Sequence, residues 1–284
     1  MHKTLIAAAI TATLALSACS TTSTQNSSAP MVQTQNPFLQ ASQLQYETPD
    51  FSKINDEHFQ PALELGIKDH YQEVLAIANN SDAATFENTI IALEKSGELL
   101  TRTSKVFYNL AGTDSNPTLR KVQGEMAPKM AAHSDNINLN PALFARIETL
   151  YNQRESLGLS AEENRLVEVY YKRFVRAGAK LTETQKQQIR VLNEEQSTLT
   201  NEFAQRLMRL TKEIAVVVDS KEQLAGLSDS AVKAAASDAE ASGHAGKYQL
   251  NITNTTRQPV LTQLQDRELR QQVWQASANR GLEG

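Results

Sequence analysis

Apolar side chains recur at helical spacing along most of the chain from about residue 55 onward. Residues that step by three or four places lie on one face of a helix, so such a row predicts a helix. The first row consists of Phe59, Leu63, Ile67, Tyr71, Val74 and Ala78. A second helix is expected to begin near Thr85 or Asn88 and to reach Ala111, with Gly97 and Ser104 leaving room for another helix to approach closely.

Capping residues before the apolar rows mark where further helices begin. An Asn before Pro, or a Ser or Thr three residues before Glu or Gln, satisfies the free N–H groups of a first helical turn. The starts marked in this way are Asn116-Pro117, Asn140-Pro141, Ser160 with Glu163, and Thr182 with Gln185. Gly178 is suited to closing the helix that Ser160 opens. Pro128 is expected to kink or split the helix that contains it.

The longest predicted helix runs from Thr182 to about Glu213 and carries a stripe close to a heptad repeat. The stripe consists of Ile189, Leu192, Gln196, Leu199, Phe203, Leu207, Leu210 and Ile214. A free-standing coiled coil is one reading of this stripe. The neighbouring segments have apolar stripes of their own, which favours burial in an antiparallel bundle.

Residues 214–253 break the helical pattern. A β-branched run at Ile214-Ala215-Val216-Val217-Val218 and the alternating segment 248–253 predict a small two-stranded β element. Ser228 begins an alanine-rich helix expected to stop near Gly243, and a last helix is expected after Pro259. The predicted fold is therefore mainly all-α, an antiparallel multi-helix bundle with this one β element.

Composition narrows the possible functions. Eleven Gly and eight Pro among 284 residues are about half the usual share, which agrees with long helices. The formal net charge is −4, with 28 basic and 32 acidic residues. Because no strong positive field exists, binding to nucleic acid is not expected.

The first 36 residues have the features of a targeting signal followed by a tether. Lys3, an apolar run from Leu5 to Leu16 and small residues precede the single cysteine, Cys19. Leu16-Ser17-Ala18-Cys19 resembles the bacterial lipobox, so residues 1–18 are expected to be a lipoprotein signal peptide and Cys19 the lipid attachment site. Residues 19–36 have the Ser, Thr, Gln and Asn composition of a flexible tether. The folded body would then be 37–284.

The resemblance to the lipobox implies a place in the bacterial cell envelope. Ser20 follows the cysteine where an inner-membrane retention signal would usually have Asp, which indicates the outer membrane and a body facing the periplasm. A lipid anchor on Cys19 would make the membrane a partner. The alternative is an ordinary cleaved secretory signal with a buried cysteine.

Searching the sequence for catalytic motifs yields no candidate residue. It contains no H-E-x-x-H, no E-x-x-H, no nucleophile elbow and no phosphate-binding loop. His70 and Glu73 share a helical face and could hold part of a metal site, but a hydrated surface pair is favoured. Carboxylate pairs such as Glu94 with Glu98 and Glu194 with Glu195 are expected to be solvated or paired with Lys and Arg. No catalytic, cofactor-binding or metal residue is therefore assigned.

Ordered segments across the body resemble the amino-terminal half of the bacterial peptidyl-dipeptidases of the thimet oligopeptidase family, which are zinc metallopeptidases. The main segments are NPFL (36–39), HFQPALELG (58–66), ENTIIALEKSGELLTR (87–102), NRLVEVYYKRFVRAGAKL (164–181), LNEEQSTLTNEFAQRL (192–207) and NTTRQPVLTQLQDR (254–267). The resemblance implies a clam-like helical peptidase whose channel admits short peptides, and of which this chain forms one half.

The resemblance also implies that the zinc centre lies elsewhere. In the family, two His of H-E-x-x-H and a downstream Glu hold zinc in a carboxyl-terminal catalytic half, and this sequence contains no such motif. The chain alone is therefore expected to bind no zinc and to be inactive, with that half as its missing partner. Asn254-Thr255-Thr256 is a candidate for contact with peptide, although capping the last helix is favoured. The alternative function is a non-catalytic, lipid-anchored helical module that binds peptides or acts as a scaffold.

Overall fold

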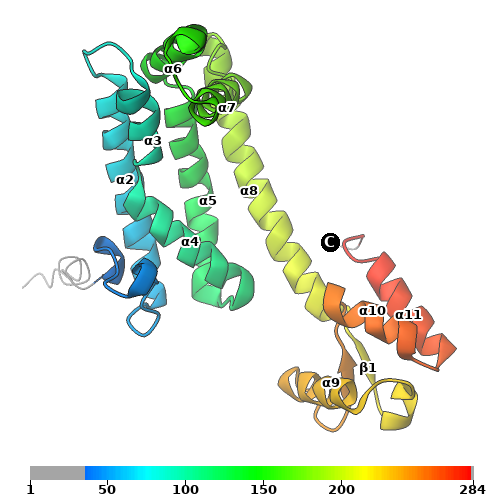
Figure 1. The fold of residues 1–284 in the computed structure, drawn as a ribbon. Helices are drawn as coiled ribbons and strands as arrows, with labels where there is room; N and C mark the ends of the chain where they lie inside the picture. The colour runs from blue at the N-terminus through cyan, green and yellow to red at the C-terminus, as the bar shows by residue number, and fades with distance from the viewer. Residues whose placement is uncertain (1–35, 283–284) are drawn as a thin grey trace, which may run out of the picture. The chain divides into compact units, whose positions relative to one another are not determined.

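The computed structural model describes residues 36–282, which are mainly helical (Figure 1). This confirms the predicted fold class. The signal segment 1–18, Cys19 and all of the tether except residue 36 lie outside the described residues. None of the helices within 36–282 combines the length and apolar composition needed to cross a bilayer.

Six long helices lie between residues 59 and 213, and most of their predicted starts are correct. They are α2 (Phe59–Ala78), α4 (Glu98–Thr113), α5 (Pro117–Asn138), α6 (Pro141–Gln153), α7 (Ala161–Ala177) and α8 (Glu183–Glu213). Asn116, Asn140, Ser160 and Thr182 each accept a hydrogen bond from a backbone N–H in the first turn that they cap. Gly178 ends α7 in the left-handed conformation.

Helix α2 packs against α4 and α5, and α5 also packs against α4 and α8 (Figure 1). Gly97 before α4 donates to Glu73 of α2, while Gln60 and Glu64 of α2 bind side chains of α5. These contacts make α2 antiparallel to α4 and parallel to α5. Helices α2, α4 and α5 thus reverse direction in turn, as expected for an antiparallel bundle.

Two apolar clusters hold this bundle together. One contains three aromatic rings, with Phe59 at 5.2 Å from Phe38 and 5.3 Å from Phe107 between ring centroids. The other includes Ile90, Ile147 and residues of α7. Aromatic pairs at such distances add to the hydrophobic stabilisation. The NPFL segment is anchored in the first cluster through Phe38.

The prediction of one continuous helix from Thr85 to Ala111 is wrong. A π-helical turn (Phe86–Ile91) leads into α3 (Ala92–Glu94), and the chain then breaks before α4. Gly97 adopts φ 72°, and a Cβ at this position would lie 2.7 Å from the ring of His70. Gly97 thus serves a close approach, as expected, but in a turn that its left-handed conformation makes possible.

The two proline predictions also differ from the structure. Helix α5 runs through Pro128 without the split that was one of the two expected outcomes, since packing against α2 and α8 offsets the lost backbone hydrogen bond. The other expected outcome, a kink at Pro128, stays a prediction. Pro259 lies inside α10 (Asn254–Gln263) instead of before the last helix. Asp266 then caps a separate helix, α11 (Arg267–Ala278), by accepting from the N–H groups of Glu268 and Leu269.

Residues 214–282 form a third apolar cluster around the predicted β element. Strand β1 (Val216–Val218) pairs antiparallel with β2 (Tyr248–Leu250), with Val217 opposite Gln249. Between them, Ser228 caps α9 (Asp229–Ala241). The buried members include Val218, Leu224, Val232, Leu250, Ile252, Val260, Leu264, Leu269 and Val273. The predicted two-stranded β element is confirmed.

Candidate functional site

Helices α5 and α8 meet through polar side chains, and a groove lies between them. Asn193 of α8 donates to Asp135 Oδ1 of α5 at 2.7 Å, and Gln205 donates to Gln123 Oε1 at 3.2 Å. Arg190 reaches Asn136 Oδ1 at 3.0 Å. The pairing of residues 193 with 135 and 205 with 123 shows that the two helices are antiparallel.

The groove has a volume of about 570 Å³ and combines amides, hydroxyls and small apolar side chains. Its lining is Tyr108, Gln123, Ala127, Met130, Ala131, Ser134, Asp135, Asn193, Gln196, Ser197, Thr200, Asn201 and Ala204. The Oδ1 atom of Asn201 is buried and has no hydrogen-bond partner among residues 36–282. A side-chain amide can both donate and accept, so this lining suits a ligand with alternating N–H and C=O groups.

Burial changes the titration of two groups in the groove. Desolvation raises the pKa of Asp135, while the hydrogen bond from Asn193 and the charge of Arg190 oppose this rise. Desolvation also raises the pKa of the Tyr108 phenol. Both shifts indicate a partly dehydrated lining, in which hydrogen bonds to a ligand would be stronger than in water.

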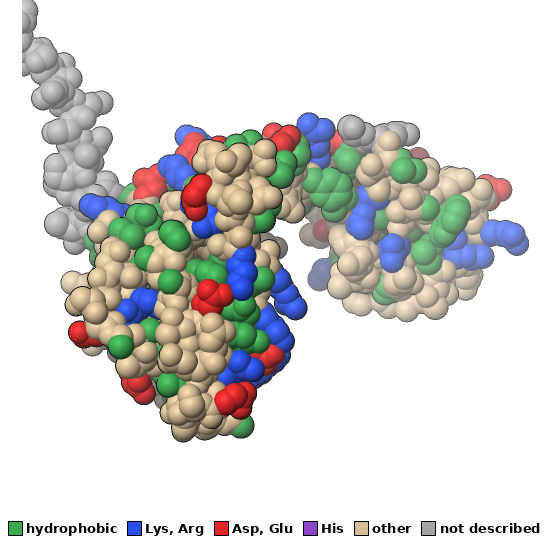
Figure 2. Space-filling view, turned by 90° about the horizontal axis from the view of Figure 1, so that it is seen from above, with side chains coloured by type: hydrophobic (Ala, Val, Ile, Leu, Met, Phe, Trp, Pro, Cys, Tyr) green, Lys and Arg blue, Asp and Glu red, His purple; other side chains and the backbone are tan. Residues whose placement is uncertain are grey.

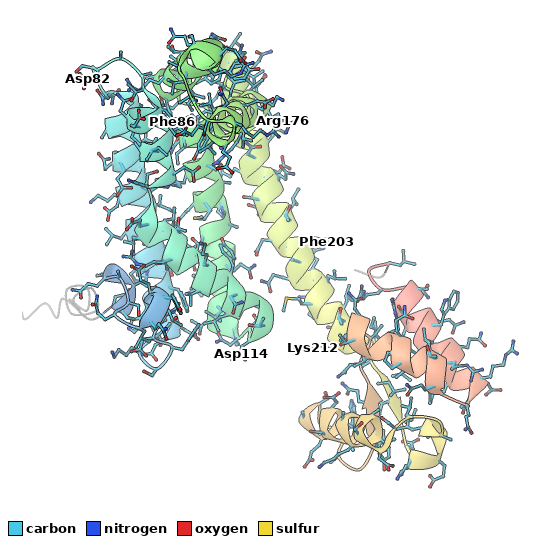
Figure 3. The ribbon with its side chains drawn as sticks, viewed as in Figure 1. Asp82, Phe86, Asp114, Arg176, Phe203 and Lys212 are labelled. Atoms are coloured by element: carbon cyan, nitrogen blue, oxygen red, sulfur yellow. The ribbon has the colours of Figure 1, made fainter. Side chains whose placement is uncertain are left out.

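The predicted apolar stripe of α8 is not buried as expected. Leu192, Leu199 and Phe203 are 56%, 55% and 65% exposed, and Phe203 lies in the second half of α8 (Figure 3). The prediction is wrong for these three side chains, whereas Ile189, Leu207, Leu210 and Ile214 are half-buried. Gln123 and Asp135 of α5 bind the amide side of α8, so that side faces α5. Hydrophobic side chains also reach the molecular surface in several places in Figure 2. We refer to Val191, Leu192, Leu199 and Phe203 as the α8 apolar row.

A chain of hydrogen bonds links His70 and His133 inside the bundle. Ser96 donates to the Leu93 carbonyl at 2.7 Å, so His70 Nε2, 3.1 Å from Ser96 Oγ, acts as the donor to that oxygen. His70 Nδ1 must then accept from His133 Nε2 at 2.9 Å. His70, which donates from one ring nitrogen and accepts at the other, is therefore neutral. The buried Nδ1 of His133 has no partner within residues 36–282.

These histidines do not form a metal site. Within residues 36–282, no three His, Cys, Asp or Glu side chains are grouped as a metal ion would need. The facing nitrogens of His70 and His133 are used on each other, and Glu73 Oε2 accepts from the backbone N–H of Gly97 at 2.7 Å. The residues present do not fit a zinc ion. The hydrated His70–Glu73 pair expected from the sequence is correct only for Glu73, which is exposed, whereas His70 is half-buried and both side chains contact the turn at Gly97.

Two other sequence candidates have structural partners. Glu94 accepts a hydrogen bond from the hydroxyl of Tyr170 at 2.6 Å, so its partner is a phenol and not Lys or Arg. Residues 254–256 form the first turn of α10, where Thr253 and Thr256 make a capping box. The capping interpretation of this segment is thus correct, although it begins α10 and not the last helix.

A row of amide and hydroxyl side chains on α8 was not predicted from the sequence. Asn193, Ser197, Asn201 and Gln205 recur every four residues, which places them on one helical face. This spacing could have predicted a polar face on the helix, but the prediction was based on the apolar stripe beside it. Cys19 lies outside the described residues, so its assignment as the lipid attachment site stays a prediction.

Comparison with known proteins indicates what kind of protein carries this groove. No family model matches the chain. It is 41% identical over 247 residues to a dipeptidyl carboxypeptidase of Escherichia coli and 41% identical over 249 residues to that of Salmonella typhimurium. An oligopeptidase A of Haemophilus influenzae is 26% identical over 248 residues.

The matches cover most of this chain but only part of each relative. They span 87% and 88% of the chain and 36% and 37% of the two dipeptidyl carboxypeptidases, so the chain spans little more than a third of their length. Over that region, the chain is related to the dipeptidyl carboxypeptidases and, more distantly, to oligopeptidase A, in keeping with the thimet oligopeptidase family that its motifs indicated.

Proposed function

We propose that this chain forms one wall of the substrate channel of a peptidase that degrades oligopeptides by releasing dipeptides from their carboxyl end. The relatives at 41% identity are dipeptidyl carboxypeptidases, which supports this reaction. The amide-lined groove between α5 and α8 is the observation that carries the proposal, because it offers hydrogen bonds suited to a peptide main chain.

The spacing of the polar side chains along α8 fits an extended peptide. A step of four residues along a helix advances about 6 Å, and two residues of an extended chain advance about 6.6 Å. Asn193, Ser197 and Asn201 could therefore meet every second residue of a peptide lying along α8. Contacts to the main chain carry little sequence preference, which suits an enzyme that accepts many peptides.

The α8 apolar row supports an assembly larger than this chain. Exposed rows of large apolar side chains mark interaction surfaces, and the chain spans only 36% of the length of its dipeptidyl carboxypeptidase relative in Escherichia coli. In our proposal, the row packs against the carboxyl-terminal catalytic polypeptide. Zinc held there would polarise the scissile carbonyl and activate water, while this chain binds and orients the peptide.

We expect Asn201→Leu to weaken peptide binding in the protein that joins this chain to such a catalytic part. Losing one amide contact should raise KM about tenfold with little change in kcat, since the contact is made in both the ground and transition states. Dipeptide release from amino-blocked oligopeptides, followed by chromatography, measures both constants.

Glu202→Gln is the matched control, because Glu202 is exposed beside Asn201 but does not line the groove. It should leave both constants unchanged. The 284-residue chain alone serves as the blank, with no release and no stoichiometric zinc. Equal KM for the Asn201→Leu variant and the wild type would count against the channel wall, and dipeptide release by the chain alone would refute the missing catalytic part.

We further propose that Cys19 carries the lipid that holds this protein at the outer membrane, facing the periplasm. The lipobox at residues 16–19 and the tether-like composition of 19–36 support this placement. In a bacterial host, Cys19→Ser should move the protein from the membrane fraction to the soluble fraction, and the wild type should incorporate labelled palmitate. A wild type that is soluble and unlabelled would show that residues 1–18 are an ordinary secretory signal.

A further inference from the structure

A second cavity lies between the segment 37–54 and α4. Its volume is about 290 Å³, close to the lower end of the roughly 300–1,000 Å³ typical of small-molecule sites. The apolar part of its lining is Pro37, Phe38, Ala41, Leu44, Pro49, Ile54 and Val106. This cavity and the α5–α8 groove share no lining residue, so what the cavity binds is a separate question from the proposed function.

Arg102 of α4 supplies a cation to the lining. Its Nε donates to the Phe38 carbonyl at 2.8 Å, which fixes the orientation of the guanidinium. Among residues 36–282, neither terminal nitrogen has a hydrogen-bond or ion-pair partner, and residues 1–35 contain no Asp or Glu. A planar guanidinium with two free donors is suited to a carboxylate.

Glu47 supplies an anion on the opposite segment. It is exposed, lines the cavity and makes no ion pair within the described part of the chain. Asp50 and Lys53, which also line the cavity, neutralise each other at 2.8 Å. The cavity therefore carries one uncompensated charge of each sign.

The backbone around Glu47 is strained. Tyr46 and Glu47 adopt φ 58° and 54°, and they are the two non-glycine residues with positive φ in the described part of the chain. Residues other than glycine adopt this conformation at a cost in free energy, and such strain gathers at ligand-binding segments. It holds Glu47 in the segment that lines the cavity together with Arg102.

We propose that this cavity binds a small zwitterion with an apolar side chain, either a free amino acid or a dipeptide. The carboxylate of the ligand pairs with Arg102, its ammonium group pairs with Glu47, and its side chain packs against Phe38 and Val106. The small volume excludes longer peptides. A free amino acid and a dipeptide both carry these charged groups, and they differ in the length of the main chain.

Calorimetric titration of the full chain, kept soluble in mild detergent, tests the proposal with four ligands. These are leucine, Ala-Leu, its amino-acetylated form and its carboxyl amide. We expect leucine or Ala-Leu to bind in the millimolar range or tighter, and each blocked form to bind at least about tenfold more weakly. Whichever of leucine and Ala-Leu binds more tightly shows whether the ligand is a free amino acid or a dipeptide.

Three variants locate the site. Arg102→Gln should weaken binding about tenfold or more, and Lys105→Gln, on an exposed α4 residue outside the lining, should leave it unchanged. Ala41→Trp fills the cavity without touching the bond from Arg102 to Phe38, so it should abolish binding even if Arg102→Gln fails to fold. The proposal is overturned if no ligand binds, if both blocked forms bind as well as Ala-Leu, or if Ala41→Trp binds normally.

Discussion

Replacing Arg146 by Met is expected to lower the free energy of unfolding by about 3 kcal/mol. Arg146 of α6 is 8% exposed, and its guanidinium donates to the carbonyls of Asn80 and Asp82 at 2.9 Å each. It also reaches Asn88 Oδ1 at 2.7 Å and Thr89 Oγ1 at 3.3 Å. Figure 3 shows where Asp82 and Phe86 lie in the segment that this arginine holds.

The cost arises because Met fills a similar volume but donates no hydrogen bond. Four buried or partly buried acceptors would lose their charged donor, and each unsatisfied group is penalised. Urea unfolding followed by circular dichroism measures the change. Arg176→Met is the matched control, since Arg176 is exposed on α7 (Figure 3) and should change stability by less than about 0.5 kcal/mol. Equal stability of the two variants would contradict the prediction.

Acidification from pH 7.5 to pH 5 is expected to reduce the contribution of His133 to stability by about 1.5 kcal/mol. Burial, and then the charge of the neighbouring His70, lower the pKa of His133 to about 4. Burial also lowers the pKa of His70, a shift that Glu73 opposes and Arg173 reinforces.

The sign follows from which state binds protons. Between about pH 6.5 and pH 4, the unfolded chain protonates His133 while the folded chain keeps it neutral. The stabilisation is therefore complete above pH 6.5 and is lost as the pH falls toward 4. A proton on His70 Nδ1 would also place two donors face to face in the 2.9 Å bond with His133.

Unfolding free energies of the wild type and two variants at both pH values separate this effect from the titration of carboxylates. His133→Gln can still donate to His70 Nδ1 but does not titrate, so it should lose about 1.5 kcal/mol less than the wild type on acidification. His244→Gln, on an exposed turn, should behave like the wild type. An identical loss in the wild type and His133→Gln would show that the pair does not govern acid stability.

Local signals explain what sequence analysis predicted correctly. The capping boxes at Ser160 and Thr182 and the Asn-Pro starts are satisfied within one helical turn, so they need no information from distant residues. The break at Gly97 was missed because its cause lies 27 residues away, in the ring of His70. The chain from Leu93 through Ser96 and His70 to His133 likewise joins residues far apart in sequence.

Four features could be read from the amino-acid sequence: the mainly helical fold, most of its helix starts, the small β element and the relationship to the dipeptidyl carboxypeptidases. These depend on periodicity, capping and ordered motifs, all of which are written along the chain. Which side of α8 meets α5 became clear only from how the helices pack. Periodicity shows that a helix has two kinds of face but not what its neighbour offers, and here Gln123 and Asp135 of α5 bind the amide side of α8, which leaves Phe203 exposed.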